Sequence, residues 1–200
     1  MAVPLSSRAE PIPGYKLLER LGRGGFGEVW KCEAPGGIFK AIKFVYGDLD
    51  TAGDDGKPAE QEFKALARVK QVRHPFILSL ERYDIVDGRL VILTELADCN
   101  LWDQFRTYRN QGLSGFPREE LLSYLHEAAE ALDMMNDEHQ LQHLDVKPQN
   151  LFLMHKHIKV ADFGMTKVFE GIRATITGGV TPVWSIPRYL PGRAPVYAAC

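Results

Sequence analysis

One stretch of the chain, His143 to Asn150, constrains its fold and chemistry more than any other. It reads His-Leu-Asp-Val-Lys-Pro-Gln-Asn. Pro148 fixes its own φ and has no backbone donor, and these properties disfavour regular secondary structure. Asp145 and Asn150 should therefore bracket a loop. His143 is expected to be a packed structural residue rather than a base.

The residues that follow this loop predict a β-hairpin. Two short apolar runs, 151–153 and 158–160, flank the polar turn 155–157. Such a hairpin would return Asp162, which lies seventeen residues after Asp145, to the loop. Two carboxylates and an amide would then converge beside Lys147. Hard oxygen ligands with a nearby cation suit Mg²⁺ and a phosphoryl group in transfer.

These two segments resemble the catalytic loop of protein kinases, H-R-D-x-x-x-x-N, followed by the metal-binding D-F-G at Asp162. The resemblance implies that Asp145 accepts or orients the proton of the substrate hydroxyl and that Lys147 contacts the γ-phosphate. It also implies that Asn150 and Asp162 hold Mg²⁺. The lysine at position 147 makes this motif resemble that of the serine/threonine-specific kinases.

One position of the motif departs from the family. Leu144 stands where most members have an arginine, which in many of them pairs with a phosphorylated activation loop. Leucine cannot make a charge-assisted hydrogen bond. We therefore hypothesise that an active enzyme with this sequence would not need phosphorylation of its activation loop.

A glycine-rich segment, 22–27, lies between two strand-like segments, 15–21 and 28–34. A dinucleotide-binding loop would open a helix. The following strand instead predicts the tip of an antiparallel hairpin, which in isolation could be a simple turn. The segment resembles the glycine-rich lid over ATP in kinases, and the resemblance implies that the nucleotide is contacted by Leu21, Gly22, Gly24, Gly25, Phe26, Gly27 and Val29.

The predicted strand 38–45 contains Lys40-Ala41-Ile42-Lys43, which resembles the V-A-I-K motif of the family. By this resemblance Lys43 pairs with the α- and β-phosphates of ATP. Ala41, on the same face of the strand, would leave room for the adenine. The alternative for Lys43 is a solvated lysine on a strand.

A helix is predicted to begin at Pro58, because proline suits the first helical position and Phe63, Leu66 and Val69 follow at helical spacing. Glu62 lies nineteen residues after Lys43, close to the usual separation in the family. We assign it to the ATP site as the ion-pair partner of Lys43. Glu60 is the alternative partner, and both could be solvated carboxylates of the first turn.

Asp87-Gly88 predicts a two-residue hairpin between strands at 78–85 and 90–93. By resemblance, the segment after the second strand is the hinge between two lobes. Thr94 would guard the deep pocket, and the backbone groups of Glu95 and Ala97 would bind the adenine edge.

The second lobe is predicted to start with a short helix at 101–105 and a longer helix from Pro117 to about Asn136. The longer helix carries an apolar stripe of Leu121, Leu125, Ala128, Leu132 and Met135. Residues 181–184 resemble the distal anchor of the activation segment. Arg188 then reverses the charge of the glutamate expected in the A-P-E motif of the family.

The fold class implied is α+β, a two-lobed protein-kinase-like fold with an antiparallel sheet and one helix in the N-lobe and an incomplete, mainly helical C-lobe. The expected boundaries are a flexible lead-in at 1–14 and a kinase domain at 15–200. That domain divides into the N-lobe, 15–94, the hinge, 95–98, the partial C-lobe, 99–184, and an atypical tail, 185–200.

Composition and charge bear on the expected partners and cellular compartment. A net charge of −2 gives no indication of a nucleic-acid partner, and no run of apolar residues is long enough to span a membrane. Three scattered cysteines favour a reducing cytoplasm. The expected partners are a protein substrate with a serine or threonine hydroxyl and a protein that would cover the incomplete C-lobe.

Three functions fit these motifs. The first is an ATP- and Mg²⁺-dependent serine/threonine protein kinase, supported by Lys43, Asp145 and Asp162. The second is a catalytically inactive nucleotide-binding or regulatory module, supported by Arg188 and the early end of the match. A small-molecule kinase of related fold is the third, and Lys147-Pro148 together with the D-F-G triplet argue against it.

Overall fold

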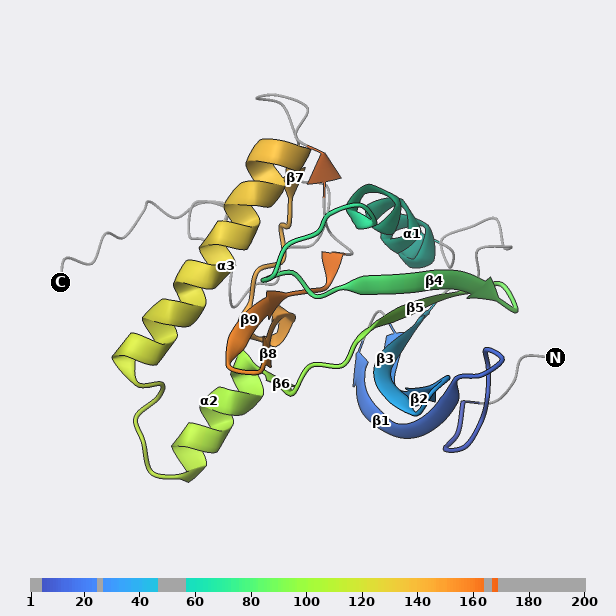
Figure 1. The fold of residues 1–200 in the computed structure, drawn as a ribbon, viewed down its shortest axis with the longest axis horizontal. Coiled ribbons are helices and arrows are strands. Elements are labelled where there is room, and N and C mark those ends of the chain that lie inside the picture. The colour runs from blue at the N-terminus through green and yellow to red at the C-terminus, as the bar shows by residue number, and fades with distance from the viewer. Residues whose placement is uncertain (1–4, 25–26, 47–56, 164–166, 169–200) are drawn as a thin grey trace, which may run out of the picture.

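The computed structural model describes residues 5–24, 27–46, 57–163 and 167–168, and for residues 57–62 and 167–168 it describes the backbone only. The first half forms a five-stranded antiparallel sheet in the order β1-β2-β3-β5-β4, with one helix, α1, beside it (Figure 1). The elements are β1 (Lys16–Gly24), β2 (Gly27–Ala34), β3 (Ile38–Val45), α1 (Lys57–Val69), β4 (Leu80–Val86) and β5 (Arg89–Glu95).

Two positions show why the sheet forms as the sequence predicts. Asp87 and Gly88, between β4 and β5, have φ values of 50° and 76°, and positive φ at both central residues is what a type I′ hairpin requires. At the start of β2, a Cβ on Gly27 would collide with the backbone carbonyl oxygen of Phe44 in β3. Glycine is therefore needed for β2 and β3 to approach at this point.

Alternating side chains give the sheet two apolar faces. On one face Leu66 of α1 packs with Val45, Leu90 and Ile92. The other face carries Leu17, Trp30, Cys32, Ile42, Phe44, Val91 and Leu93. Because successive strand residues point to opposite faces, β5 contributes Leu90 and Ile92 to one cluster and Val91 to the other.

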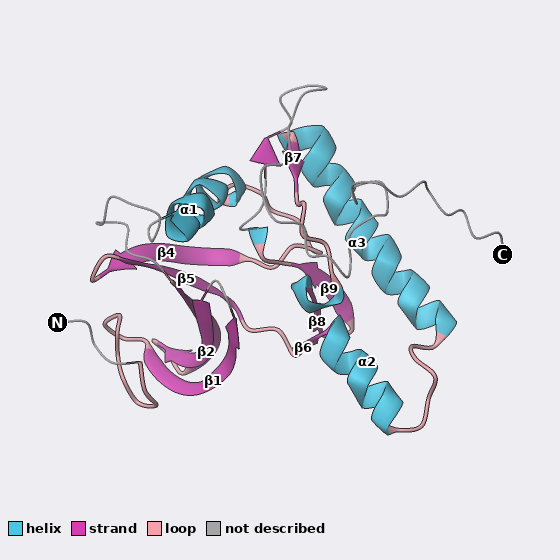
Figure 2. Cartoon of the chain, turned by 180° about the vertical axis from the view of Figure 1, so that it is seen from behind, coloured by secondary structure: helices cyan, strands magenta, loops and turns pink. Residues whose placement is uncertain are grey.

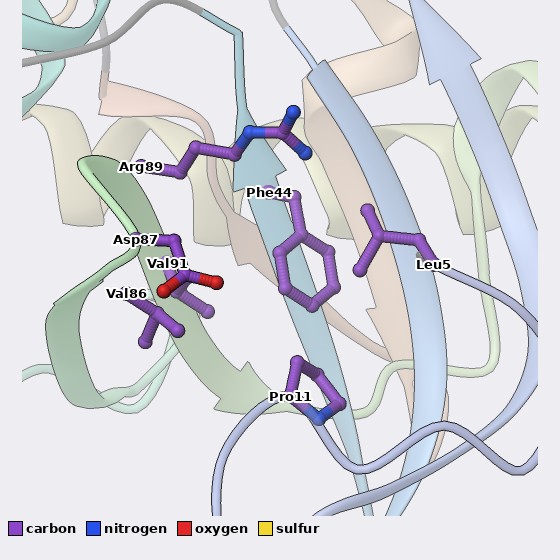
Figure 3. Close-up of a pocket in the computed structure, with 7 residues that line it drawn as sticks. All are labelled: Leu5, Pro11, Phe44, Val86, Asp87, Arg89 and Val91. Carbon is purple, nitrogen blue, oxygen red and sulfur yellow. The ribbon is translucent and has the colours of Figure 1, made fainter. Parts of the chain in front are cut away.

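Residues 5–14, part of the predicted flexible lead-in, pack against the sheet in the structure. The backbone N–H groups of Arg8 and Leu17 donate to Leu17 and Ala9, respectively, and Ile12 is buried in the second cluster. Leu5 and Pro11 lie beside the Phe44 ring at a small pocket on this face (Figure 3). The segment therefore covers one face of the sheet.

The second half is mainly helical and carries small sheets (Figure 2). It contains β6 (Cys99–Asn100), α2 (Leu101–Asn110), α3 (Arg118–His139), β7 (Leu141–Gln142), a 3₁₀ turn (Pro148–Asn150), β8 (Leu151–Met154), β9 (His157–Val160) and β10 (Lys167–Val168). The Asn100 side chain caps α2 by accepting the N–H of Asp103 at 2.9 Å. The helix continues well past the predicted end at residue 105.

The buried stripe of α3 is displaced from the predicted one. Tyr124, Ala128, Ala131 and Met135 are buried, whereas Leu125 is 47% exposed. Tyr124 can be buried because its hydroxyl has a partner, donating to Glu120 at 2.9 Å. The prediction that Leu125 belongs to the core face is therefore wrong.

The two halves share a core. Val69, Val72 and Ile77, from the first half, cluster with buried residues of α3, β7, β8 and β9. Ile77 forms a parallel bridge with Val160, where the Leu78 N–H donates to the Val160 carbonyl at 2.9 Å. This two-lobed arrangement confirms the predicted fold class. In the described part of the chain, no helix has the length and apolar character of a membrane span.

Candidate active site

The predicted hairpin is present and brings the two motif segments together. β8 and β9 pair from Leu151 opposite Val160 to Met154 opposite His157. His155 and Lys156 form the turn, both with positive φ. The Ala161 N–H donates to the Asn150 carbonyl at 2.9 Å and closes the hairpin onto the 3₁₀ turn. Asp162 therefore follows directly from a strand that is anchored to the catalytic-loop segment.

Asp145, Lys147 and Asn150 form one network. Lys147 Nζ lies 2.8 Å from Asp145 Oδ2. Asn150 Nδ2 donates to the same carboxylate oxygen at 3.0 Å and to the Asp145 carbonyl at 2.9 Å. The Asp145 side chain is only 10% exposed. Two donors thus hold this carboxylate in one orientation, and fixed orientation is what a catalytic group in general needs.

Asp162 contacts Lys43 of β3. Lys43 Nζ is 3.3 Å from Asp162 Oδ1. The Asp162 side chain is 38% exposed, and its partial desolvation opposes ionisation of the carboxyl. The Lys43 ammonium, with further contributions from His143 and Lys147, outweighs that effect and holds the pKa below its ordinary value. The carboxylate is therefore negative at neutral pH, as a metal ligand needs to be.

The His143 ring contacts both the catalytic-loop segment and the residues after β9. The buried ring accepts the Asp145 N–H on Nδ1 at 3.3 Å, and its Nε2 lies 2.9 Å from the Ala161 carbonyl oxygen. Nε2 must therefore carry the proton and donate it. Burial lowers the pKa of this imidazole, which favours the same neutral form. The ring also packs against Phe163, with the centroids 5.2 Å apart. This is the structural role expected from the sequence.

The donor set fits a magnesium ion that is also bound by phosphate. In the described residues no group of three or more His, Cys, Asp or Glu side chains could hold a metal by itself. Because Asn150 Nδ2 is committed to Asp145, the Asn150 amide offers its oxygen to a cation. One amide oxygen and the ionised Asp162 match Mg²⁺, which takes one or two protein ligands and completes its shell with phosphate and water.

Several of the predicted nucleotide residues share one face of the sheet with Lys43. Val29 in β2 lies opposite both Lys43 in β3 and Gly22 in β1. Directly opposed residues point to the same face, as do Ala41 and Lys43 two positions apart. Gly24 ends β1, and Leu21 is 49% exposed.

Three predicted residues fall partly or wholly outside the described part. Gly25 and Phe26 lie in the gap between β1 and β2, and for Glu62 the structure describes the backbone in α1 but not the side chain. The predicted Lys43–Glu62 ion pair stays a prediction. The segment resembling the distal anchor and Arg188 also lie outside the described residues.

The hinge region contains a partner that the sequence did not indicate. Glu95, at the end of β5, lies 3.1 Å from Lys159 Nζ of β9 and accepts the Ser79 N–H at 2.8 Å. Lys159 stands between buried Ile158 and Val160 in a strand pattern that predicts a solvent-facing residue. Only the tertiary structure shows that its ammonium reaches Glu95. Ala97, the other predicted hinge residue, follows β5 in a loop.

Comparison with known proteins agrees with this geometry. The family model described as "Protein kinase domain" matches residues 15–199. The chain is 25% identical over 198 residues to a carbon catabolite-derepressing protein kinase of Candida tropicalis, covering 96% of this chain and 30% of the relative. It is 29% identical over 164 residues to mouse death-associated protein kinase 2, covering 78% and 42%.

A third relative, the cell division control protein 2 homolog 2 of Trypanosoma brucei brucei, is 24% identical over 193 residues, with 91% of this chain and 53% of the relative covered. The chain therefore spans between about a third and about half of the lengths of these three relatives.

Proposed function

This chain belongs to the protein kinase family, and we propose that it transfers the γ-phosphate of ATP to a serine or threonine hydroxyl of a protein substrate. The observation that carries the proposal is the convergence of Lys43, Asp145, Lys147, Asn150 and Asp162, which come from β3, the catalytic-loop segment and the end of the β8–β9 hairpin. Phosphoryl transfer needs positioning and charge neutralisation, and these side chains supply both.

Each side chain has a role that follows from its contacts. Asp145 accepts or orients the proton of the substrate hydroxyl, because its carboxylate is fixed by Lys147 and Asn150. Lys147 can swing its ammonium from Asp145 to the γ-phosphate. Lys43, already beside Asp162, would bind the α- and β-phosphates. Asn150 and Asp162 would hold Mg²⁺, and a bound ion would supply charge neutralisation at the phosphates.

The nucleotide would lie under β1 and β2, against the face that carries Val29, Ala41 and Lys43. The adenine edge would meet the backbone of Glu95 and Ala97. We assign residues 15–94 to the N-lobe, 95–98 to the hinge, 99–184 to the partial C-lobe and 185–200 to an atypical tail. The end of β5 at Glu95 and the start of β6 at Cys99 support the hinge boundaries.

Leu144 supports a further part of the proposal. It is half-buried, and its side chain has no group that could bind a phosphorylated activation segment. Activity is therefore independent of phosphorylation there. Phosphatase-treated protein and untreated protein are expected to have equal transfer rates, and a strict requirement for phosphate would contradict this part alone.

The test of the main proposal is transfer of radiolabelled γ-phosphate from Mg²⁺-ATP to a generic protein substrate, with Asp145→Asn as the variant. The amide cannot act as a base, so the transfer rate should fall by roughly 10²–10⁴ while ATP affinity changes little. Lys43→Met should instead weaken ATP binding itself. Loss of transfer with ATP binding retained tests the role of Asp145, and loss of ATP binding tests the role of Lys43.

Transfer that survives Asp145→Asn unchanged would refute the assigned chemistry. Binding of ATP by the unaltered chain without any transfer would favour the regulatory module over the enzyme. Phosphoamino-acid analysis of the product tests the predicted preference for serine and threonine, which rests on Lys147.

A further inference from the structure

A cavity of about 560 Å³ lies in the helical half of the molecule, separate from the catalytic-loop network. Its walls come from α2, α3, the residues around β6 and the β8–β9 turn, which lie side by side in both ribbon views (Figures 1 and 2). None of its nine lining residues belongs to the group around Asp145, Asn150 and Asp162. The volume is in the range of protein ligand sites.

The Glu120 carboxylate lines this cavity and is held by two tyrosine hydroxyls. The Tyr108 hydroxyl lies 2.8 Å and 2.9 Å from its two oxygens, and the Tyr124 hydroxyl donates to it at 2.9 Å. The pKa of the Tyr108 phenol is raised by this hydrogen bond, so the phenol keeps its proton and donates it. Glu120 is thus a negatively charged group whose orientation is fixed before any ligand arrives.

The remaining lining gives the cavity a negative balance. Asp98 contributes a second carboxylate, which accepts the His155 N–H at 2.9 Å. Among the described residues that line the cavity, Lys156 is the one cation. The pKa of the Cys99 thiol is raised first by burial and then by the carboxylates of Asp103 and Asp98. Asp103 and Asp98 therefore place negative charge near the Cys99 thiol.

Apolar surface completes the lining. Tyr124 and Leu153 are both only 6% exposed and form part of the hydrophobic core, while their outer atoms line the cavity. Carboxylates beside aromatic rings and an aliphatic wall suit a cation on an apolar stem. A guanidinium in particular can form paired hydrogen bonds to a carboxylate and stack on an aromatic face.

We propose that this cavity is a docking site for an arginine or lysine side chain of a protein partner. The cationic head would bind Glu120 and Asp98, and the alkyl stem would lie along Tyr124 and Leu153. Such a site would recruit a partner through contacts distinct from those of phosphoryl transfer.

The test uses the full chain without nucleotide and a fluorescein-labelled eight-residue peptide of leucine, glycine and two arginines. Binding is followed by fluorescence anisotropy. Glu120→Gln and Asp98→Asn should each weaken binding of the peptide about three- to tenfold, because each removes a negative charge that would pair with a peptide arginine. The matched control is Glu119→Gln, which removes the same charge from the neighbouring position of α3, where the side chain is 84% exposed.

Replacing both arginines of the peptide by citrulline, which keeps the shape and removes the charge, should abolish measurable binding. Equal weakening by Glu119→Gln would mean attraction by the overall field and would overturn the docking site. No effect of Glu120→Gln or Asp98→Asn would overturn it as well. Because nucleotide is absent, a failure of ATP binding or transfer leaves these outcomes unchanged.

A second readout needs no variant of the cavity. Alkylation of Cys99 in the unaltered chain is measured by mass spectrometry of the Cys99-containing fragment, with and without peptide. The arginine peptide should slow alkylation at least about threefold, matching occupancy of the cavity, and the citrulline peptide should not. An alkylation rate that the arginine peptide leaves unchanged would overturn the proposal even if all variants fold poorly.

Discussion

The ion pair between Lys159 and Glu95 joins the two lobes, and its removal gives the sharpest stability prediction. Their side chains are 15% and 16% exposed, and the Lys159 ammonium lies 3.1 Å from Glu95 Oε1. The same oxygen accepts the Ser79 N–H, just before β4. One carboxylate therefore connects the end of β5 to β4 in the N-lobe and to β9 in the C-lobe.

Lys159→Met removes the cation but keeps most of the apolar stem. Breaking a fully buried pair from one side costs about 3–5 kcal/mol. Glu95 retains the Ser79 donor and some exposure, so we expect a loss of about 2 kcal/mol in the free energy of unfolding. For a chain of this size that loss lowers Tm by roughly 4–8 °C.

The assay is a double-mutant cycle measured by urea unfolding. Glu95→Gln removes the negative charge and still accepts the Ser79 N–H, so the double variant leaves no uncompensated charge. The double variant should lose less than the sum of the two single losses, with a coupling of about 1–2 kcal/mol. Losses that add within about 0.3 kcal/mol would refute the view that this pair couples the lobes.

Three further predictions concern single groups. Gly27→Ala should lower the free energy of unfolding by about 2 kcal/mol or more, whereas Gly24→Ala, whose Cβ would meet no atom within 4 Å, should stay within about 0.5 kcal/mol. Glu127→Ala leaves the buried Ile158 N–H of β9 without its acceptor at 2.7 Å, so the free energy of unfolding should fall by about 2–3 kcal/mol. The control, Glu130→Ala, should lower it by only about 0.5 kcal/mol, because the Glu130 side chain is 53% exposed. Urea unfolding measures the glycine pair and the glutamate pair. Burial lowers the folded-state pKa of His143 below the ordinary 6.5, so its contribution to stability is complete above about pH 6.5 and is lost as the pH falls toward the folded-state value. His143→Gln should remove that part of the pH dependence from a series of urea titrations, and an unchanged slope would contradict the buried neutral form.

Much of the fold was predictable because its signals are local. Asp87-Gly88 specifies a turn through its own backbone preferences, and strand alternation specifies the two faces of the sheet. The face of α3 was not predictable in the same way. Leu125 and Tyr124 are both apolar enough for a core, and the choice between them depends on a hydroxyl partner that only the folded helix supplies. Prolines in 5–14 exclude regular structure but say nothing about burial, so the packing of Ile12 was missed.

In the candidate site too, contacts between residues close in sequence were predictable and contacts between distant residues were not. Asp145, Lys147, Asn150 and Asp162 lie within eighteen residues of one another, so loop and hairpin signals were enough to predict that they converge. The partner of Glu95 lies sixty-four residues away in a different sheet. Its strand carries no sequence signal that distinguishes an inward-reaching lysine from a solvated one. Interactions of this range appear only when the two lobes are placed against each other.

The site also contains backbone strain whose position is informative. Leu144 and Asp162 have φ values of 62° and 64°, a left-handed region that costs a non-glycine residue about 1–2 kcal/mol. Aspartate tolerates this region, but leucine does not favour it. Both residues neighbour a group bound by His143, which accepts the Asp145 N–H and donates to the Ala161 carbonyl. The buried imidazole thus fixes the spacing between the catalytic-loop segment and Asp162, the proposed metal ligand, and the strain at Leu144 accompanies a spacing that places Asp145 and Asp162 at one site.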